Sequence, residues 1–353
     1  MPADLSLTAP PRLGAPAKRS PWPGLLLTAA IAALAFLPRA LSGAAMLNPL
    51  VLAILFGILL RALMSLRVGG LAGRGLPTWA PRGLALSQKQ VLRSAIALLG
   101  LQIGMGQIAE IGWAGAAIAL GCLIASFLFT RALGRWLGVD RDLSILIAAG
   151  TSICGASAIA AVNSATRAPE EDAAYAIACI TLFGTAAMLL YPLIAALLPL
   201  GPHGYGLWSG VSLHEIGQAV AAAFQGGDAA GQTGTIAKLL RVAMLPVLVL
   251  LLAWRGARKA RKSGAAPAPL VMPWFVLGFI ALMILGNLVD LPPALKTRAN
   301  DATIFLLCMG LAAMGLATDL SKIRAKGLRP LLVAGGGTLF ISLLGLGLTL
   351  WLV

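Results

Sequence analysis

Apolar stretches of roughly 20 residues recur along this chain, and short joints that carry most of the charged residues separate them. Each stretch can cross a hydrocarbon core of about 30 Å as an α-helix, and only helices or closed barrels satisfy their backbone there. Charged residues make up 11% of the chain, whereas a soluble domain carries about 25%. The sequence therefore predicts an all-α, polytopic transmembrane bundle and argues against a soluble enzyme.

The apolar stretches predict about eleven spans behind an amino-terminal tail. We interpret residues 1–23, rich in Pro and Ala, as a disordered cytoplasmic tail, and residues 24–353 as one transmembrane domain. A cleaved signal peptide is the weaker alternative, because the first apolar run leads to Arg39 without a clear cleavage site. The expected spans are Gly24–Leu41, Leu47–Leu63, Val91–Ile108, Trp113–Leu133, Leu143–Ala165, Ala173–Leu198, Gly206–Phe224, Thr235–Trp254, Pro273–Val289, Thr303–Ala317 and Leu331–Val353.

The net charge of +15 reflects Lys and Arg in the joints between spans. These cations do not form one amphipathic face, so they indicate membrane topology and not a nucleic-acid partner. The joints after the second, fourth, eighth and tenth expected spans are basic, which places the amino terminus in the cytoplasm and the carboxyl terminus on the opposite, periplasmic side. Under this topology the acidic joints, including Glu170–Asp172 and Asp228, face the periplasm.

Weak internal similarity suggests inverted repeats. Leu98–Ile111 is similar to Leu306–Ile323, and Pro49–Gly57 is similar to Pro273–Ala281. Each pair lies seven expected spans apart, which gives its members opposite orientations. A third similarity, between the Gly-x-Ser sequences at 150–152 and 210–212, lies two spans apart and would be parallel.

The fifth expected span is rich in Gly and hydroxyl groups and contains Thr151, Ser152, Cys154, Gly155 and Ser157. Such a composition weakens a helix at membrane depth. A discontinuous helix exposes N–H groups where its second half begins, and that positive end can hold an anion. Close packing of small residues between helices is the alternative interpretation, and it stays open.

The seventh expected span places His214 and Glu215 side by side, with Ser212 and Gln218 nearby. An ionisable residue at bilayer depth costs at least about 2.5 kcal/mol on insertion scales, so this pair implies a partner or a water-filled cavity. His titrates near neutral pH, which suits proton coupling. Alternatively, the pair lies near a helix end and contacts water. We expect this segment, like the fifth, to be interrupted, with its break at Ser212–Glu215 and both breaks facing one polar cavity.

In the eighth expected span, Lys238 and Arg241 lie three residues apart and share a helical face. They either reach the outer interface or supply positive charge to a site, with Glu215 as a candidate partner.

The four cysteines have neither paired nor metal-ligand spacing. We interpret Cys122, Cys179 and Cys308 as packing residues. Since no metal-ligand set and no G-x-S-x-G sequence is present, we expect no enzyme, no metal and no cofactor.

Several segments resemble a known family. They are GTSICGASAIAAV at 150–162, WSGVSLHEIGQAVAAA at 208–223, AKLLRVAML at 237–245 and PWFVLGF at 273–279. They resemble the bacterial sulfate exporter family, itself similar to the superfamily of bile-acid/sodium symporters and cation/proton antiporters. The resemblance implies two unwound helices that cross at a substrate site between a core bundle and a moving panel. The parallel orientation of the fifth and seventh expected spans departs from that pattern.

The sequence thus predicts a secondary-active transporter of a small anion, such as sulfate or a related sulfur oxyanion, working by alternating access. The alternative is a cation/proton antiporter of the same architecture. Expected partners are the anion, a coupling proton or sodium ion, and the lipid bilayer, and a homo-oligomer stays open. The expected substrate-binding residues are Thr151, Ser152, Cys154, Gly155, Ser157, Ser212, Gln218 and Arg241, with His214, Glu215 and Lys238 as coupling or charge partners.

Overall fold

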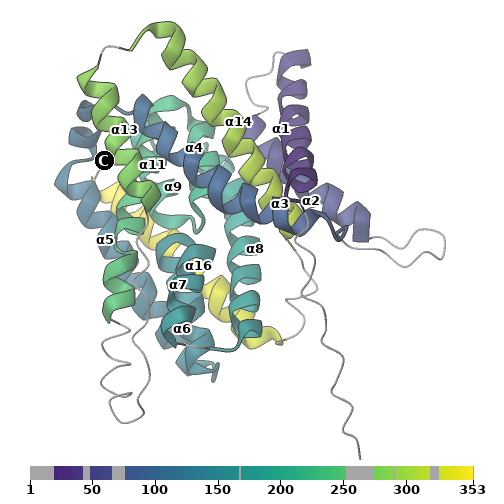
Figure 1. Ribbon diagram of the computed structural model, residues 1–353. Coiled ribbons are helices and arrows are strands. Elements are labelled where there is room, and N and C mark those ends of the chain that lie inside the picture. The colour runs from purple at the N-terminus through teal and green to yellow at the C-terminus, as the bar shows by residue number, and fades with distance from the viewer. Residues whose placement is uncertain are drawn as a thin grey trace, which may run out of the picture.

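The computed structural model describes residues 20–42, 48–65, 76–166, 168–251, 274–289, 291–318 and 326–352. Within these ranges the chain is helical and contains no β-strand (Figure 1). Five of the described helices are long and apolar enough to cross a membrane: Ile111–Trp136, Glu170–Ala195, Asp228–Leu251, Pro293–Ala317 and Leu328–Leu352. The all-α prediction is confirmed, the count of eleven spans is not, and most of the predicted tail lies outside the described residues.

The helices pack into two groups. The first, which we call the scaffold group, contains α1 (Trp22–Ser42), α2 (Pro49–Ser65), α3 (Ala80–Leu86), the π-helix η1 (Ser87–Val91), α4 (Leu92–Leu99), η2 (Gly100–Gln102), α13 (Trp274–Leu288) and α14 (Pro293–Ala317). The second, the core group, contains α5 (Met105–Trp136), α6 (Arg141–Ala149), the π-helix η3 (Gly150–Cys154), α7 (Ala156–Thr166), α8 (Glu170–Ala195), α9 (Pro202–Ser212), α10 (Ile216–Ala223), η4 (Phe224–Gly226), α11 (Asp228–Ala243) and α16 (Leu328–Leu352).

The main contacts between the groups join α10 to α2 and α14, and α11 to α13.

Small residues bring the helices within each group close together. A Cβ on Gly57 of α2 would lie 2.4 Å from the carbonyl oxygen of Ala312 on α14. In the core group a Cβ on Gly210 of α9 would lie 2.4 Å from the carbonyl oxygen of Gly234 on α11. Close backbone approach at small residues is typical of membrane helices.

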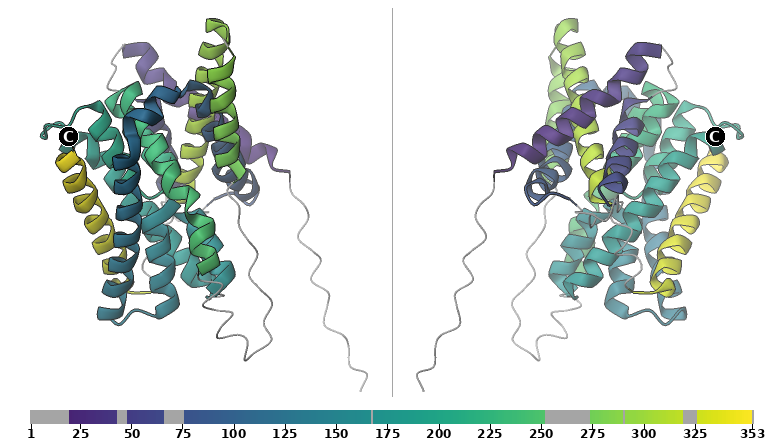
Figure 2. Two further views of the ribbon diagram at one scale, coloured as in Figure 1. Left: turned by 90° about the vertical axis from the view of Figure 1, so that its left-hand side faces the viewer. Right: turned by 90° about the vertical axis from the view of Figure 1, so that its right-hand side faces the viewer.

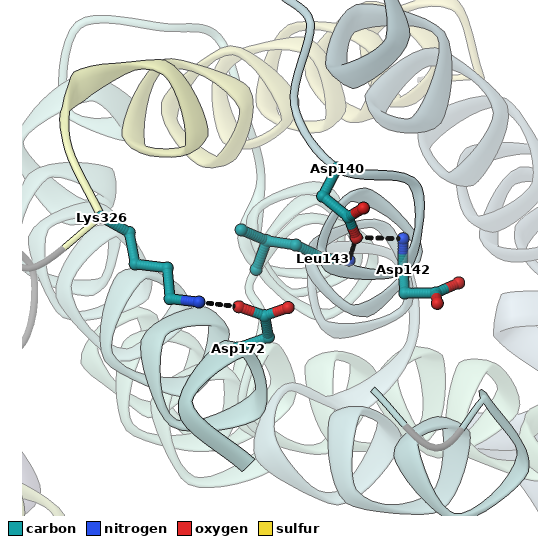
Figure 3. Close-up of polar contacts among 5 residues, drawn as sticks. All are labelled: Asp140, Asp142, Leu143, Asp172 and Lys326. Atoms are coloured by element: carbon teal, nitrogen blue, oxygen red, sulfur yellow. Dashed lines mark hydrogen bonds and ion pairs between the residues drawn. The ribbon is translucent and has the colours of Figure 1, made fainter. Parts of the chain in front are cut away.

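The segment α6–η3–α7 enters and leaves the bundle at the same end. The Asp140 carboxylate caps the start of α6 by accepting from the N–H of Asp142 at 2.8 Å. Asp172, in the first turn of α8, forms an ion pair with Lys326, and Asp140, Asp172 and Lys326 line one shallow cavity (Figure 3). Since α7 leads directly to α8, the starts of α6 and α8 lie together, and residues 141–166 form a re-entrant hairpin that we call hairpin 1.

We call this end of the bundle, where Arg135, Arg141, Lys326 and Arg329 lie, the basic end. A short hydrogen bond from Lys326 to the Asp172 carboxylate raises the pKa of Lys326 above its ordinary value. The Tyr175 hydroxyl donates to the carbonyl of Gly327 at 3.1 Å, which further ties the start of α8 to the start of α16. From here α16 runs to the opposite end of the bundle, where the chain terminates (Figure 2).

A second hairpin enters from the opposite end. Its arms are α9 and α10, joined by Leu213, His214 and Glu215, and we call residues 202–223 hairpin 2. The Tyr205 hydroxyl donates to the carbonyl of Ala222 at 2.8 Å, so the start of α9 lies beside the end of α10. His203 contacts the Thr233 hydroxyl at 3.0 Å near the start of α11.

These hairpins correct the predicted topology. The fifth and seventh apolar stretches are not spans, because each returns to the end from which it came. Glu170–Asp172 therefore lie at the basic end and not opposite to it. The Gly-x-Ser sequences at 150–152 and 210–212 lie on arms that enter from opposite ends, so they are not parallel as expected. A helical hairpin has about the same length in sequence as one span, which is why a window of hydropathy cannot separate the two.

Candidate functional site

The tips of the two hairpins meet inside the bundle. Hairpin 1 turns at Gly155, whose φ of 67° is the left-handed conformation that glycine adopts readily. Hairpin 2 turns at His214, and the backbone of Leu213 and Glu215 on either side of it is extended. The structure thus interrupts both segments where the sequence predicts discontinuous helices. The side chains around the two turns are buried in protein, which is where broken backbone is tolerated at membrane depth.

The Glu215 carboxylate lies at the start of the second arm of both hairpins. Its Oε1 accepts a hydrogen bond from the N–H of Ala156, the first residue of α7, at 2.5 Å. It also accepts from the N–H of Gln218, and the Gln218 side chain accepts in return from the N–H of Glu215 at 3.2 Å, which makes a capping box for α10. Helix N-termini carry partial positive charge, so one carboxylate neutralises two of them.

Two cations of α11 contact the carbonyl groups at which the first arms of the two hairpins end. Lys238 Nζ donates to the carbonyls of Ile153 and Leu213, each at 2.7 Å. Arg241 donates to the carbonyls of Thr151 and Ser152 at 2.9 Å, of Leu213 at 2.9 Å and of Gly210 at 3.2 Å. These carbonyls end the first arms and carry partial negative charge. Lys238 and Arg241 are therefore bound by backbone of both hairpins.

This geometry differs from two expectations for Lys238 and Arg241. They do not reach an outer interface, because their exposed fractions are 0% and 1%. Arg241 contacts the carbonyl ends of the first arms and not the N–H groups at the start of α7. Within the described part of the chain, neither cation forms an ion pair with Glu215. Sequence position alone gives the depth of these residues but not which pole of a broken helix they contact.

Other expected site residues bond within or between helices. His214 contacts the carbonyl of Thr151 at 3.3 Å and the hydroxyl of Thr338 on α16 at 2.8 Å. The hydroxyls of Ser152 and Ser212 donate to carbonyls four residues earlier, at 2.6 Å and 2.7 Å. The Gln218 amide donates to the carbonyl of Thr181 and the hydroxyl of Thr185 on α8, at 3.2 Å and 3.1 Å. Cys154 is buried. These contacts connect the tips to the rest of the core group.

A cavity of about 480 Å³ lies between hairpin 1, α8 and the scaffold group, on the basic side of the tips. We call it the tip cavity. Of the expected site residues, Ser157 and Glu215 line it. Its other polar lining comes from Gln88, Lys89, Arg93, Thr181 and Thr318.

Two cations, Lys89 and Arg93, line the tip cavity but are not among the expected site residues. The guanidinium of Arg93, on α4, donates to the hydroxyl of Ser157 at 3.3 Å and so joins the scaffold group to hairpin 1. Arg93 lies two residues inside the third expected span, Val91–Ile108. Near the start of a span a cation can also reach the membrane surface, so the sequence carries no signal that separates the two roles.

A second cavity, of about 650 Å³, lies between the same two groups at the opposite end. Its lining includes Gln102, Gln232 and Asn287, with Asp228 and Lys296 as charged residues. Within the scaffold group, a Cβ on Gly310 of α14 would lie 2.8 Å from Leu92 of α4. Between the groups, a Cβ on Gly217 of α10 would lie 3.5 Å from Leu92, so Leu92 is in van der Waals range of hairpin 2. No cluster of three His, Cys, Asp or Glu suited to a metal occurs among the residues that the structure describes.

Comparison with known sequences places the chain in a family. The family described as conserved hypothetical protein 698 matches residues 23–334, which includes both hairpins and the tip cavity. The chain belongs to this family. The family is thus one of membrane proteins, as the names of the curated relatives show.

A UPF0324 membrane protein of Pseudomonas aeruginosa is 39% identical over 88% of this chain and 89% of its own length. Those of Listeria monocytogenes and Agrobacterium fabrum are 35% and 36% identical over 93% of this chain and 95% and 92% of their own lengths. No solved structure matches. Together with the apolar helices, these relatives show a multi-pass membrane protein.

Proposed function

We propose that this protein is a secondary-active transporter that moves a small anion across the membrane by alternating access. One observation carries the proposal: two hairpins that enter from opposite ends meet at a polar junction beside a cavity with two cationic side chains. Discontinuous helices whose ends converge on one point are the common device by which transporters hold ions at mid-depth. The proposal assigns the chain no enzymatic activity and no cofactor.

The arrangement of cavities supports alternating access. The tip cavity and the cavity at the opposite end lie between the same two helix groups, on either side of the hairpin tips. Contacts between the groups are concentrated where α10 meets α2 and α14 and where α11 meets α13. Movement of the core group against the scaffold group would therefore expose the junction first to one side and then to the other, with little internal rearrangement.

The charge of the tip cavity supports an anion. Lys89 and Arg93 contribute two positive charges to its lining and Glu215 one negative charge. Lys89 and Arg93 are exposed side chains, so they are accessible to an anion that enters the cavity. The resemblance to the sulfate exporter family makes sulfate or a related sulfur oxyanion the first substrate to test.

The proposed location is a bacterial inner membrane, with the basic end in the cytoplasm. The prediction that the chain begins in the cytoplasm and ends in the periplasm stays unchanged. Replacing two of the expected spans with re-entrant hairpins removes two crossings, so an odd number of crossings stays odd. The inverted repeats stay a prediction, and the opposite entry of the two hairpins favours them.

The test is uptake of labelled sulfate, and separately of labelled sodium, into proteoliposomes that contain the purified protein. We expect saturable sulfate uptake that Arg93→Gln reduces at least tenfold, because the variant removes a cavity cation. Arg329→Gln, which removes a cation of the basic end that does not line the tip cavity, should transport like the parent. Sodium uptake without uptake of any anion would contradict the proposal.

A cation/proton antiporter is the second candidate, because a buried carboxylate, Glu215, lines the tip cavity. Under this alternative the order of effects reverses: Glu215→Gln would abolish sodium uptake, and Arg93→Gln would merely weaken it. The same flux experiment therefore separates the two functions.

A further inference from the structure

The Glu215 carboxylate shares the tip cavity with two cations and is enclosed by protein on its other sides. Lys89 of η1 and Arg93 of α4 line the same cavity. Lys238 of α11 and Cys154 of η3 face Glu215 from behind the tips, and His214 precedes it in the chain. Glu215 is 9% exposed, whereas Lys89 and Arg93 are exposed, so the carboxylate is the charged group of this cavity whose ionised form is most disfavoured by burial.

The charges of the cavity lining give a rule for what can be bound. Lys89 and Arg93 less Glu215 leave one net positive charge while the carboxylate is ionised. A divalent anion would change this net charge to minus one, next to a carboxylate that already repels it. If Glu215 takes up a proton, the two cations balance the divalent anion and the occupied cavity is neutral. Buried charge is tolerated when it is compensated, which favours the protonated form.

Glu215 can take up this proton without losing its hydrogen bond to hairpin 1, and the proton gives it a donor for the anion. Oε1 accepts from the N–H of Ala156 at 2.5 Å, and a protonated carboxyl group can keep that bond through its carbonyl oxygen. The O–H that it gains is a donor, whereas the ionised group has acceptors alone. Protonated Glu215 can thus donate to an oxygen of the bound anion and still cap α7. His214 is less suited, because its ring contacts Thr151 and Thr338 and does not line the tip cavity.

We infer that Glu215 is the proton-coupling residue of this transporter and that one proton is bound and released with each divalent anion. The inference rests on the proposed function and adds the charge class of the substrate and the coupling ion. The proton comes from water in the cavity, binds a carboxylate oxygen of Glu215, and returns to water on the other side when the anion leaves. Binding must be reciprocal: the anion raises the affinity of Glu215 for the proton, and the proton raises the affinity for the anion.

The experiment measures sulfate flux and proton movement together, in proteoliposomes that hold a pH-sensitive dye. For the parent we expect one proton per labelled sulfate ion, with uptake that falls by up to about tenfold per pH unit as the external pH rises. Glu215→Gln keeps an acceptor for the N–H of Ala156 and cannot ionise. It should lose proton movement and pH dependence while sulfate uptake or exchange continues.

Asp172→Asn is the matched control, because Asp172 is also a buried carboxylate but lies outside the tip cavity. We expect this variant to keep the parent's proton coupling. Sulfate flux in the parent without proton movement, or proton movement retained in Glu215→Gln, would overturn the coupling and leave the anion carrier intact. Absence of flux for every divalent anion would contradict both. If Glu215→Gln does not fold, sulfate-dependent proton uptake by the purified parent decides the question, and its absence counts against the inference.

Discussion

Replacing Arg241 tests whether this residue contacts the substrate or the protein. The sequence alone predicts that Arg241→Gln abolishes anion binding in a folded protein. In the structure Arg241 makes four hydrogen bonds to the carbonyls of Thr151, Ser152, Gly210 and Leu213, with no side of it open to either cavity. We now expect Arg241→Gln to destabilise the junction of the hairpins.

The loss of stability in Arg241→Gln can be estimated from the hydrogen bonds that the variant cannot make. Leu213 keeps the donor Lys238 and Thr151 keeps its contact with His214, so the carbonyls of Ser152 and Gly210 are the ones that lose their side-chain donor. Each buried carbonyl left without a donor costs about 1–3 kcal/mol, so we expect a loss of about 2–6 kcal/mol. For a chain of this length the melting temperature should fall by roughly 3–8 °C.

The assay uses the cysteines of the chain itself. Cys122, Cys154, Cys179 and Cys308 are free and buried, so a dye that becomes fluorescent on reaction with thiols reports their exposure as the protein unfolds in detergent. Arg93→Gln is the control, because it removes a cation that already lies beside a cavity and should change the melting temperature little. Parent-like stability of Arg241→Gln, combined with complete loss of sulfate binding, would refute the structural role and restore the sequence-based one.

Two further predictions concern packing and topology. Gly57→Ala should lower the melting temperature, because its Cβ would lie 2.4 Å from the backbone carbonyl of Ala312, whereas Gly121→Ala, which meets nothing within 4 Å, should not; equal melting temperatures would count against the close contact of α2 and α14. Cysteines introduced at the exposed positions Glu171 and Asp228 should react with an impermeant thiol reagent from opposite sides of the membrane. Labelling of both from one side would mean that hairpin 2 is a span after all, because α8 and hairpin 2 alone separate the two positions in the chain.

Much of the site could be predicted from composition at membrane depth. The Gly and hydroxyl cluster around Gly155 indicated a broken helix, and the adjacent His214 and Glu215 indicated a second one. Both breaks can be predicted because Gly, hydroxyl and ionisable residues disfavour a continuous helix at membrane depth, and these residue types are read directly from the sequence. The direction of the chain after each break does not, because the residues after Gly155 form the same apolar helix whether they continue across the membrane or return.

The missed residues have a similar explanation. Lys89 falls in the basic joint before the third expected span, and Arg93 falls near the start of that span, where a cation can reach the membrane surface. In the structure the π-helix η1 and α4 carry them to the side of hairpin 1. Their role depends on the packing of the scaffold group against the core group, and no short segment of sequence encodes that packing.

Whether a charged side chain opposes the partial charge of the backbone that it contacts distinguishes a structural role from a functional one. Lys238 and Arg241 lie at carbonyl ends of broken helices, and Glu215 lies at N–H ends, so each opposes the partial charge of the backbone that it contacts. These three are needed to bury the tips whether or not a ligand binds. Lys89 and Arg93 have no such backbone pole to neutralise among their described contacts, and they line the cavity. Under the proposed function the ligand that balances these two cations is an anion. Of the three buried charges at the junction, Glu215 also lines the cavity, so its charge affects both the helix N-termini that it contacts and the ligand.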